Sequence, residues 1–333
     1  MKIIRWALGG IALFCIVFTA VFGYKQINKK SFALEQKQYK GVLTLWHIDT
    51  FEGGKGSRKA YLLKVAREYE KTFNGVLVMV VSHTPDSVLK AYEQGENPDM
   101  ISFGLGVKVN TPVQLSKKQS SSGGVINDKV YAKAWCKGGY LLIAKKDEKV
   151  DLQSKEIENL VVSSTTYNQP LTALALQEYT AKNLTTKAPL DAYVEFLSKK
   201  DTVLLGTQRD VIRLENRGVE CQTFVLTEFN DLYQYISVTS KDDEKIEYSK
   251  KFIDLLMTEK HQKNLSSIGM FSDFYKIGYQ NEHLIKMQNT KEFLTFSAFT
   301  DATTLLNLKD LSKKAVNGDV ESLKKLKKMP FLP

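Results

Sequence analysis

The chain has 333 residues, of which 43% are hydrophobic and 25% charged, so it can form two lobes with sizeable cores. Its formal charge of +10 is concentrated at one end. Seven of the 47 Lys and Arg residues, but one of the 37 acidic residues, lie in positions 1–40, which leaves about +4 on the rest. A charge spread this thinly does not indicate a nucleic-acid-binding protein. The lysine-rich end, SLKKLKKMPFLP, is typical of a solvated helix face rather than of a nucleic-acid or lipid contact.

The first elements in chain order are a membrane segment and a linker. Lys2 and Arg5 precede an apolar run from Trp6 to Tyr24, which is about long enough to span a bilayer. Bulky residues before Cys15 do not suit lipid attachment, and the cleavage site before Tyr24 is weak. We therefore expect an uncleaved membrane anchor, with a cleaved signal peptide as the alternative. Either one places the body of the protein on the extracytoplasmic face of the cell membrane.

The next segments alternate between strand and helix patterns. VLTLWH predicts a strand, and Ser57 can cap a following helix with an apolar stripe at Leu62, Ala66, Tyr69 and Phe73. The continuous apolar run VLVMVVS predicts a strand buried on both faces. A helix over 85–94 and the strand DMISFG complete a β-α-β-α-β unit with a parallel sheet.

The pattern resumes in the second half of the chain. GYLLIAK and NLVVSS predict strands, followed by one helix from Pro170 to about Lys182 and another at LDAYVEFLSKK. TVLLGTQRDVIRLENR predicts a strand, a glycine turn and a helix, and LYQYISV a further strand. Helices follow at DEKIEYSKKFIDLLMT and EKHQKNLSSIG, and the tail from about Asn289 is expected to be helical. The chain is thus predicted to be an α/β protein.

The connection DTFEGGKGSR raises the question of what binds there. It lacks the Walker A spacing and the GxGxxG dinucleotide fingerprint, so a nucleotide site is not expected. Ligands of open parallel sheets bind beyond the carboxyl ends of the strands. The strand ends and the glycine loop therefore predict ligand contacts at Trp46, Asp49, Gly54, Ser57, Thr84 and Phe103. Alternatively, Trp46 is a core residue and Asp49 a turn former.

Metals and cofactors are not expected. The four histidines lack metal-ligand spacing, and no CxxC or HExxH motif is present. Cys136 and Cys221 are the two cysteines of the body. Outside the cell they are able to form a disulfide, and buried free thiols are the alternative.

The stretches LTLWHIDTFEGGKGSRKAYLLKVAREYEK and GENPDMISFG resemble the start of bacterial extracellular solute-binding proteins, the carbohydrate-type receptors of ABC importers. KGGYLLIAKK, VLLGTQRDVIRLENRG, LYQYISV and KKFIDLLMTEKHQKNLSSIGMFS follow in that family's order, so the resemblance covers nearly everything after Lys40. One departure is the missing lipidation signal, which such receptors usually carry in bacteria without an outer membrane.

The resemblance implies two α/β lobes joined by a hinge, as in type II periplasmic binding proteins, closing on a ligand. Residues 1–24 would be the membrane or signal segment and 25–40 the linker. Lobe 1 would comprise 41–137 and 236–272, and lobe 2 138–235 and 273–333. An ABC permease would be the partner.

The resemblance also implies binding residues on lobe 2 and near the hinge. They would be Tyr167, Asn168 and Gln169 after one strand, Gln208 and Arg209 at the turn GTQRD, and Trp135. Sugars suit such a set, because their carbon-bound hydrogens pack on aromatic rings and their hydroxyls take directional hydrogen bonds. Alternatively, Arg209 only pairs within its helix and Trp135 only packs near the hinge.

The sequence therefore predicts a receptor that binds a small ligand, a carbohydrate, between two closing lobes and delivers it to an ABC permease. Two other interpretations stay open. One is a sensor or surface interaction module with the same fold and no permease. The other is a carbohydrate-active enzyme, although no pair of acidic residues stands out as an acid and a base.

Overall fold

The computed structural model describes residue 18, residues 39–290 and residues 294–333. The predicted membrane segment and linker lie almost wholly outside the described residues, so their nature stays a prediction. Among the residues described, no helix combines the length and the apolar character needed to cross a membrane. Residues 41–333 form one compact unit, and all that follows concerns that unit.

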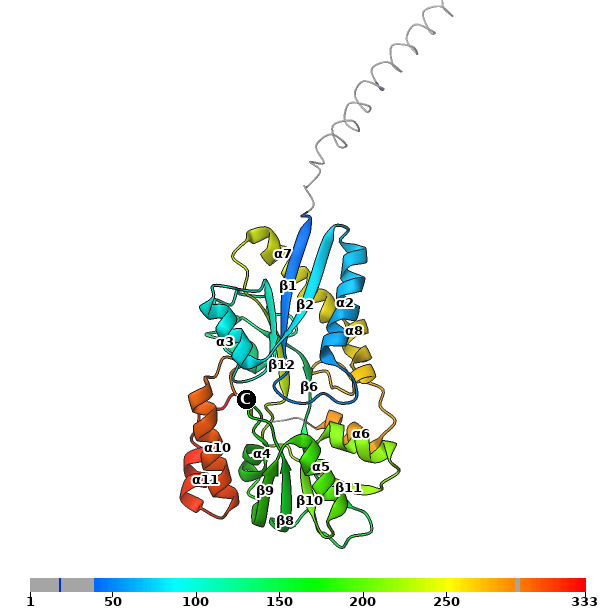
Figure 1. Cartoon of the computed structure of the whole chain (residues 1–333), viewed down its shortest axis with the longest axis vertical. Helices are drawn as coiled ribbons and strands as arrows, with labels where there is room; N and C mark the ends of the chain where they lie inside the picture. Colours follow the sequence, from blue (N-terminus) through cyan, green and yellow to red (C-terminus); the bar gives the residue numbers. More distant parts are fainter. Residues whose placement is uncertain (1–17, 19–38, 291–293) are drawn as a thin grey trace, which may run out of the picture. The chain divides into compact units, whose positions relative to one another are not determined.

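Lobe 1 is built on a five-stranded sheet in the order β2-β1-β3-β12-β6 (Figure 1). Its strands are β1 (Gly41–Ile48), β2 (Val76–His83), β3 (Met100–Phe103), β6 (Lys133–Lys137) and β12 (Tyr233–Val238). β1 pairs in parallel with β2 and β3, whereas β12 pairs antiparallel with both β3 and β6. The predicted parallel β-α-β-α-β unit is thus present and is extended by two strands from later in the chain.

Four helices cover the sheet of lobe 1 (Figure 1). They are α2 (Arg58–Thr72), α3 (Pro85–Glu93), α7 (Asp243–Leu256) and α8 (Glu259–Lys263). The hydroxyl of Ser57 accepts a hydrogen bond from the backbone N–H of Ala60, as its predicted capping role requires. The stripe of α2 at Leu62, Ala66 and Tyr69 is buried as predicted. Helix α2 is therefore held by its cap at one end and by its apolar face along its length.

Lobe 2 has its own five-stranded sheet in the order β11-β7-β10-β8-β9. Its strands are β7 (Tyr140–Lys145), β8 (Glu156–Ser163), β9 (Thr180–Lys187), β10 (Val203–Thr207) and β11 (Cys221–Val225). β8, β9 and β10 are parallel to one another, and β7 runs antiparallel to β10 and β11. The three parallel strands and their helices repeat the β-α-β-α-β arrangement of lobe 1.

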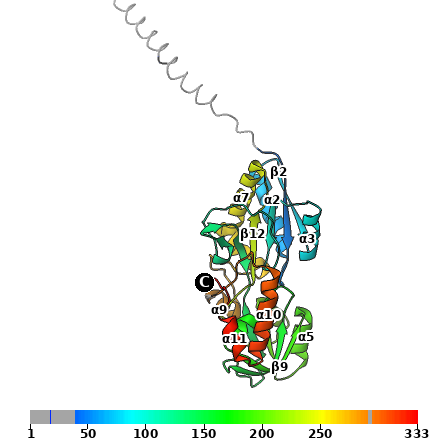
Figure 2. The ribbon, with the colours of Figure 1, turned by 90° about the vertical axis from the view of Figure 1, so that its left-hand side faces the viewer.

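The helices of lobe 2 include the C-terminal pair, which packs against α4 beside β9 (Figures 1 and 2). They are α4 (Pro170–Leu176), α5 (Pro189–Ser198), α6 (Gln208–Asn216), α9 (Glu282–Asn289), α10 (Ala302–Val316) and α11 (Val320–Leu326). Short elements complete the unit: η1 (Ser122–Gly124), β4 (Val125–Ile126), β5 (Lys129–Val130) and η2 (Asn264–Ile268). The tail is helical in α10 and α11, as predicted, but 294–301 is not.

Two predictions about secondary structure are wrong. The helix predicted from Pro170 to about Lys182 ends at Leu176, and the chain continues as strand β9. β9 is an edge strand whose side chains are mostly exposed and polar, so it shows no apolar alternation. β2 is also an edge strand: it buries alternate residues and exposes Leu77 and Met79, so it is not buried on both faces.

Three segments connect the two sheets. The first runs from Lys137, at the end of β6 in lobe 1, to Tyr140, at the start of β7 in lobe 2. The second leads back from β11 of lobe 2 to β12 of lobe 1. The third lies near Phe271, whose backbone bridges to Lys137. The exact lobe ranges stay a prediction, and β12 already begins at Tyr233. Cys136 and Cys221 lie in different sheets as free thiols.

Candidate functional site

A cleft of about 820 Å³ lies between the two lobes. Residues 49–58, the connection from β1 to α2, line its lobe 1 wall. On lobe 2 the wall consists of residues 165–167, which connect β8 to α4, and of one face of α6. The α6 residues in the cleft are Arg209, Ile212, Arg213 and Asn216, at the spacing of a single helix face. Both walls thus lie at carboxyl ends of parallel strands, where the sequence predicted a ligand site.

The glycines of the lobe 1 wall allow the loop to approach the chain near η2. The backbone N–H of Lys55 donates to the carbonyl of Ile268 at 3.0 Å. A Cβ atom at Gly54 would stand 2.1 Å from the carbonyl oxygen of Gly269. Gly269 itself has a φ of +67°, which favours glycine. Position 54 therefore needs glycine for packing of backbone on backbone, and this packing fixes one end of the loop.

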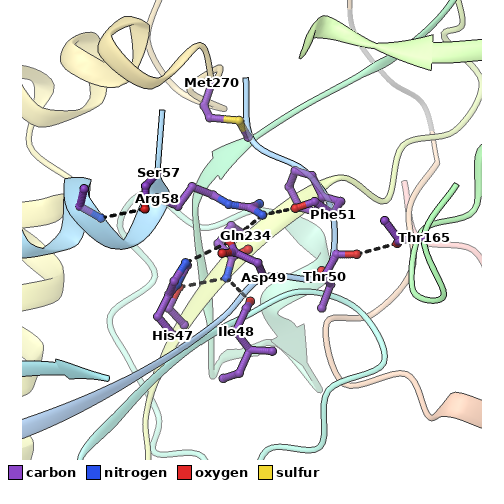
Figure 3. A network of polar contacts seen from close by, with 12 residues as sticks. His47, Ile48, Asp49, Thr50, Phe51, Ser57, Arg58, Thr165, Gln234 and Met270 are labelled. Carbon is purple, nitrogen blue, oxygen red and sulfur yellow. Dashed lines mark hydrogen bonds and ion pairs between the residues drawn. The ribbon is translucent and has the colours of Figure 1, made fainter. Parts of the chain in front are cut away.

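Arg58 fixes the other end of the loop from the start of α2 (Figure 3). It is 2% exposed, and its Nη2 lies 2.7 Å from Oδ1 of Asp49. The same nitrogen donates to the carbonyl of Phe51, and the guanidinium carbon lies 4.1 Å from the centre of the Phe51 ring. A buried arginine with a carboxylate, a carbonyl and a ring is a strong positioning device, since its planar fork satisfies several acceptors at once.

Behind this loop, a buried polar network joins four strands of the lobe 1 sheet, and Figure 3 shows its members His47, Asp49 and Gln234. The hydroxyl of Ser102 on β3 receives Nε1–H of Trp135 on β6 at 3.0 Å and Nε2–H of Gln234 on β12 at 3.1 Å. Nδ1 of His47 on β1 lies 3.1 Å from the same hydroxyl, and Nε2 lies 3.1 Å from Oδ1 of Asp49.

The network assigns the tautomer of His47. Two groups that can only donate contact the Ser102 hydroxyl: the indole N–H of Trp135 and the amide NH₂ of Gln234. The same NH₂ group also donates to the carbonyl of Ile48. These two donors occupy both lone pairs of the Ser102 oxygen. The Ser102 proton must then point to Nδ1 of His47. Nδ1 of His47 then accepts this hydrogen bond, and Nε2 carries a proton that faces Asp49.

The order Ser102–His47–Asp49 resembles that of a catalytic triad, but its placement does not suit nucleophilic catalysis. Ser102 is 0% exposed, and its oxygen is enclosed by Trp135 and Gln234. A nucleophile must reach its substrate at bonding distance, and here the hydroxyl lies within the sheet. The network instead connects the ends of the strands that carry the cleft loop.

Asp49 is the member of this network that lines the cleft, with a side chain that is 55% exposed. Burial raises the pKa of its carboxyl, but the hydrogen bond from His47 and the charge of Arg58 outweigh it and lower the pKa to about 2. Asp49 is therefore a carboxylate at any physiological pH. Its remaining oxygen lone pairs are available to accept hydrogen bonds from a ligand.

The lobe 2 wall begins with a tight turn, residues 164–168, which is held by hydrogen bonds between its own residues. The side-chain oxygen of Asn168 accepts hydrogen bonds from the hydroxyl of Ser164 and the backbone N–H of Thr165. The hydroxyl of Thr165 donates to the carbonyl of Thr50 at 2.8 Å, so one hydrogen bond joins the two walls directly. Tyr167 is partly exposed in the cleft, where its ring lies close to Gly106 of lobe 1. The turn thus presents one hydroxyl and one aromatic ring.

Helix α6 contributes charged groups to the same wall. Arg209 forms an ion pair with Glu52 of the lobe 1 loop, the second direct contact between the walls. Burial and the neighbouring charge of Arg213 lower the pKa of Arg209. The helix begins with a capping box in which Thr207 and Asp210 are reciprocally bonded. That cap orients the first turn of α6, from which Arg209 points to the cleft.

The predicted site residues separate into three groups. Those that line the cleft are Asp49, Gly54, Ser57, Tyr167 and Arg209. Those buried behind it are Trp46, Phe103, Trp135, Asn168, Gln169 and Gln208. Thr84 is exposed as the cap of α3 and does not line the cleft.

Gln208 and Trp46 show which contacts the buried group makes within the protein. The Gln208 side chain accepts from the N–H of Gly139 at 3.2 Å and donates to the sulfur of Met270, so it holds the connection between the sheets. Trp46 packs against His83, with ring centres 4.4 Å apart, and against Tyr92. Both side chains are satisfied by the protein itself.

Most cleft residues were not singled out from the sequence, among them Glu52, Arg58, Thr165 and Arg213. One sequence signal pointed to Arg58. The first turn of α2 has no acidic residue and starts with Arg58 and Lys59. Cations are unfavourable at a helix N-terminus, so a buried partner such as Asp49 was to be expected. Within the described ranges, no group of three metal-ligating side chains comes together.

Comparison by sequence finds nothing: no family model matches the chain, and no curated protein matches it.

Solved structures, in contrast, match over most of the chain. The galacto-N-biose-/lacto-N-biose I-binding protein of the ABC transporter from Bifidobacterium longum has a TM-score of 0.58 and 13% identity, covering 86% of this chain and 94% of that one. The GacH receptor of Streptomyces glaucescens, solved also with acarbose, has a TM-score of 0.57 and 11% identity over 87% and 96%. Iron-bound HitA from Pseudomonas aeruginosa has a TM-score of 0.55 and 11% identity over 82% and 99%. At such identities the likeness shows the fold, that of two-lobed solute-binding proteins, and not the ligand.

Proposed function

We propose that this protein is an extracytoplasmic solute receptor that binds a small ligand, a carbohydrate, between its two lobes and delivers it to an ABC permease. The observation that carries the proposal is the cleft itself. Strand-end loops of both lobes line it, and the Thr165–Thr50 hydrogen bond and the Arg209–Glu52 ion pair bridge it. A ligand that touches both walls would favour the closed arrangement of the lobes.

The side chains of the cleft support a sugar as ligand. Thr166 and Asn216 offer exposed hydroxyl and amide groups, and Asp49 offers a carboxylate. Tyr167 adds an aromatic ring at the edge of these polar groups. Directional polar groups beside a ring face suit a pyranose, which combines hydroxyls with apolar C–H faces. Two of the similar structures were solved with saccharides or related compounds, and a third was solved with iron.

Catalysis on the ligand is not part of the proposal. The Ser102 hydroxyl is enclosed by other side chains, and Asp49 is held as a carboxylate by His47 and Arg58. The proposed sequence of events is binding, closure and release to a permease. Attachment to the membrane through the N-terminal segment belongs to the same proposal.

The test is a thermal-shift screen of the full chain in mild detergent against a library of neutral and acidic saccharides. A ligand at about a hundred times its dissociation constant adds about 2.7 kcal/mol to the free energy of unfolding. Small-angle scattering with the best ligand then measures the radius of gyration. We expect a decrease on binding, and a bound state with the same radius of gyration would contradict a closing receptor.

Two variants connect the closure to the cleft. Arg209→Gln removes the ion pair between the walls and should reduce both affinity and ligand-induced compaction. Arg217→Gln is the matched control, because Arg217 caps the same helix outside the cleft. Equal effects of the two variants would show that α6, rather than the Arg209 contact, is responsible.

A further inference from the structure

The cleft carries more positive than negative charge. Four cationic side chains line it, Lys55, Arg58, Arg209 and Arg213, against the carboxylates of Asp49 and Glu52. The carboxylates already have partners, since Asp49 pairs with Arg58 and Glu52 with Arg209. Among the described residues, Lys55 and Arg213 have no ion-pair partner. The excess of positive charge thus consists of one unpaired group on each wall.

Arg213 is held beside another arginine without compensation from the cleft. It follows Arg209 by four residues on the same face of α6, where like charges destabilise a helix. Its Nη1 is buried and has no hydrogen-bond partner in the described structure. Its guanidinium lies 5.4 Å from the centre of the Tyr193 ring, which limits where the side chain can point. A buried, unsatisfied guanidinium nitrogen is costly unless something else accepts its proton.

The opposite wall offers a second, independent place for an anion. Nη1 of Arg58 is also without a hydrogen-bond partner among the described residues, although Arg58 is 2% exposed and lines the cleft. Arg58 starts the fifteen-residue helix α2, whose first turn contains no acidic residue. The N-terminal N–H groups of a helix and its dipole favour a negative charge. The buried guanidinium and the helix terminus therefore act in the same direction.

We propose that the ligand is an acidic saccharide, one that carries a carboxylate, sulfate or phosphate group, recognised between Arg213 of α6 and the N-terminal turn of α2 with Arg58 and Lys55. This inference rests on the proposed receptor function and specifies its ligand class. An anion placed there would satisfy the two unpaired guanidinium nitrogens. It would also reduce the repulsion between Arg209 and Arg213.

The acidic groups near the site do not oppose an anion. Asp49 and Glu52 are each neutralised by an arginine. Asp210 is buried in the first turn of α6, where it accepts the backbone N–H of Thr207 at 2.9 Å, and it does not line the cleft. Guanidinium groups bind carboxylate, sulfate and phosphate oxygens in pairs, which gives such a site geometric selectivity as well as charge.

The experiment compares ligands of the same size that differ in charge. Calorimetry on the full chain in mild detergent would use trigalacturonic acid and its fully methyl-esterified, neutral form. A sulfated chondroitin disaccharide and glucose 6-phosphate would test the other two anionic groups, and inorganic sulfate the anion without a sugar. We expect at least one acidic sugar to bind at least about tenfold more tightly than the neutral ester. This preference should weaken between about 50 mM and about 500 mM salt, because salt screens charges.

Two variants locate the preference on the protein. Arg213→Gln should remove it, so that the acidic sugar and its neutral ester bind with similar affinity. Arg217→Gln is the control: its guanidinium also lies 5.4 Å from the Tyr193 ring, but outside the cleft. Retention of the full preference in Arg213→Gln would overturn the assignment.

The remaining outcomes separate this inference from the function. If neutral sugars bind as tightly as acidic ones, the ligand class is wrong and the saccharide receptor stands. If inorganic sulfate binds as tightly as the acidic sugars, the site recognises a free anion and the sugar part of the inference is wrong. If no saccharide binds at millimolar concentration, the receptor proposal fails and this inference fails with it.

Discussion

The connections β1–α2 and β8–α4 occupy equivalent places in the two lobes. Each follows the first strand of a β-α-β-α-β unit, and each strand lies between its two parallel neighbours. The lobe 1 connection is longer, rich in glycine and tied to a buried network through Asp49 and Arg58. The lobe 2 connection is short and is closed by the side chain of Asn168. The two meet where Thr165 donates to the carbonyl of Thr50.

This difference suggests a division of tasks between the walls. On lobe 1 Asp49 is paired with Arg58 and is linked through His47 to strands β1, β3, β6 and β12, so this part of the wall is preorganised. On lobe 2 the cleft side chains of Tyr167 and Arg213 are partly exposed, and Nη1 of Arg213 has no hydrogen-bond partner among the described residues. Preorganised groups fix the geometry of a site, whereas unsatisfied ones gain most from a ligand. Lobe 1 would then set the position of the ligand, while the anionic group that identifies it would contact both walls.

The largest expected effect is on the lobe 1 side, at Trp46. Trp46→Ala should cost about 3–5 kcal/mol of stability, because a 6% exposed indole packed on His83 and Tyr92 is removed from the core. Affinity per folded molecule should stay nearly unchanged. Urea unfolding and calorimetry on the same sample measure both quantities. A loss of affinity above about 1 kcal/mol with little change in stability would instead make Trp46 a ligand platform, as the sequence analysis predicts.

A second test concerns the glycine loop. Gly54→Ala should destabilise the protein by about 1–3 kcal/mol, because its Cβ would collide with the backbone of Gly269 and the loop would have to shift. Gly278→Ala is the control, since no atom lies within 4 Å of the added Cβ. Equal unfolding free energies for Gly54→Ala and the control would show that the loop is not packed as described. In that case this packing would not preorganise the lobe 1 wall, and the contrast with lobe 2 would be weaker.

A third test addresses the aromatic ring of the lobe 2 wall. Tyr167→Ala should weaken sugar binding by about 1 kcal/mol, the usual value of an aromatic contact beyond its buried area. Melting should change little, because the side chain is partly exposed. Tyr167→Phe keeps the ring and should bind nearly as well as the original protein. If Tyr167→Phe loses as much affinity as Tyr167→Ala, the hydroxyl rather than the ring makes the contact.

Much of the fold could be predicted from sequence, because most strands and helices have strong apolar patterns. The cap at Ser57 and the stripe of α2 are examples, and both are observed. β9 could not, because an edge strand with one buried alanine carries almost no pattern. Three residues separate the end of α4 from its sequence TAKNLTTK, so the sequence alone favours a helix that continues to about Lys182.

The candidate site was predictable in position but less so in composition. The positions of strand ends predict the loop after β1, and the resemblance implies the loop after β8, yet neither tells which side chains point outward. Trp46 and Trp135 have residue types suited to sugars, but the sheet buries both. A cation at a helix N-terminus marks Arg58 as unusual, but its partner Asp49 is identified by their contact in the structure. Such pairings depend on tertiary contacts that a single sequence does not encode in any local pattern.

The smallest expected effect is the acid dependence of the lobe 1 wall. The pKa of Asp49 is about 2 in the folded protein, below its ordinary value of 3.8. Its ion pair therefore contributes stability above about pH 4 that is lost as pH falls toward 2. The contribution is small, because the side chain is 55% exposed and water screens the pair. Asp49→Asn should flatten the decline in unfolding free energy between about pH 4 and pH 2, measured by urea titration.

Asp231→Asn provides a contrast of opposite sign: burial raises the pKa of Asp231 to about 7, against hydrogen bonds from Tyr140 and Gln169. Asp231 lowers stability as pH rises from about 4 to 7, so its variant should flatten that higher range and leave the acid range unchanged. An acid decline in Asp49→Asn as steep as in the original protein would mean that Arg58 and His47 do not hold this carboxylate, and the preorganised wall would lose its electrostatic basis.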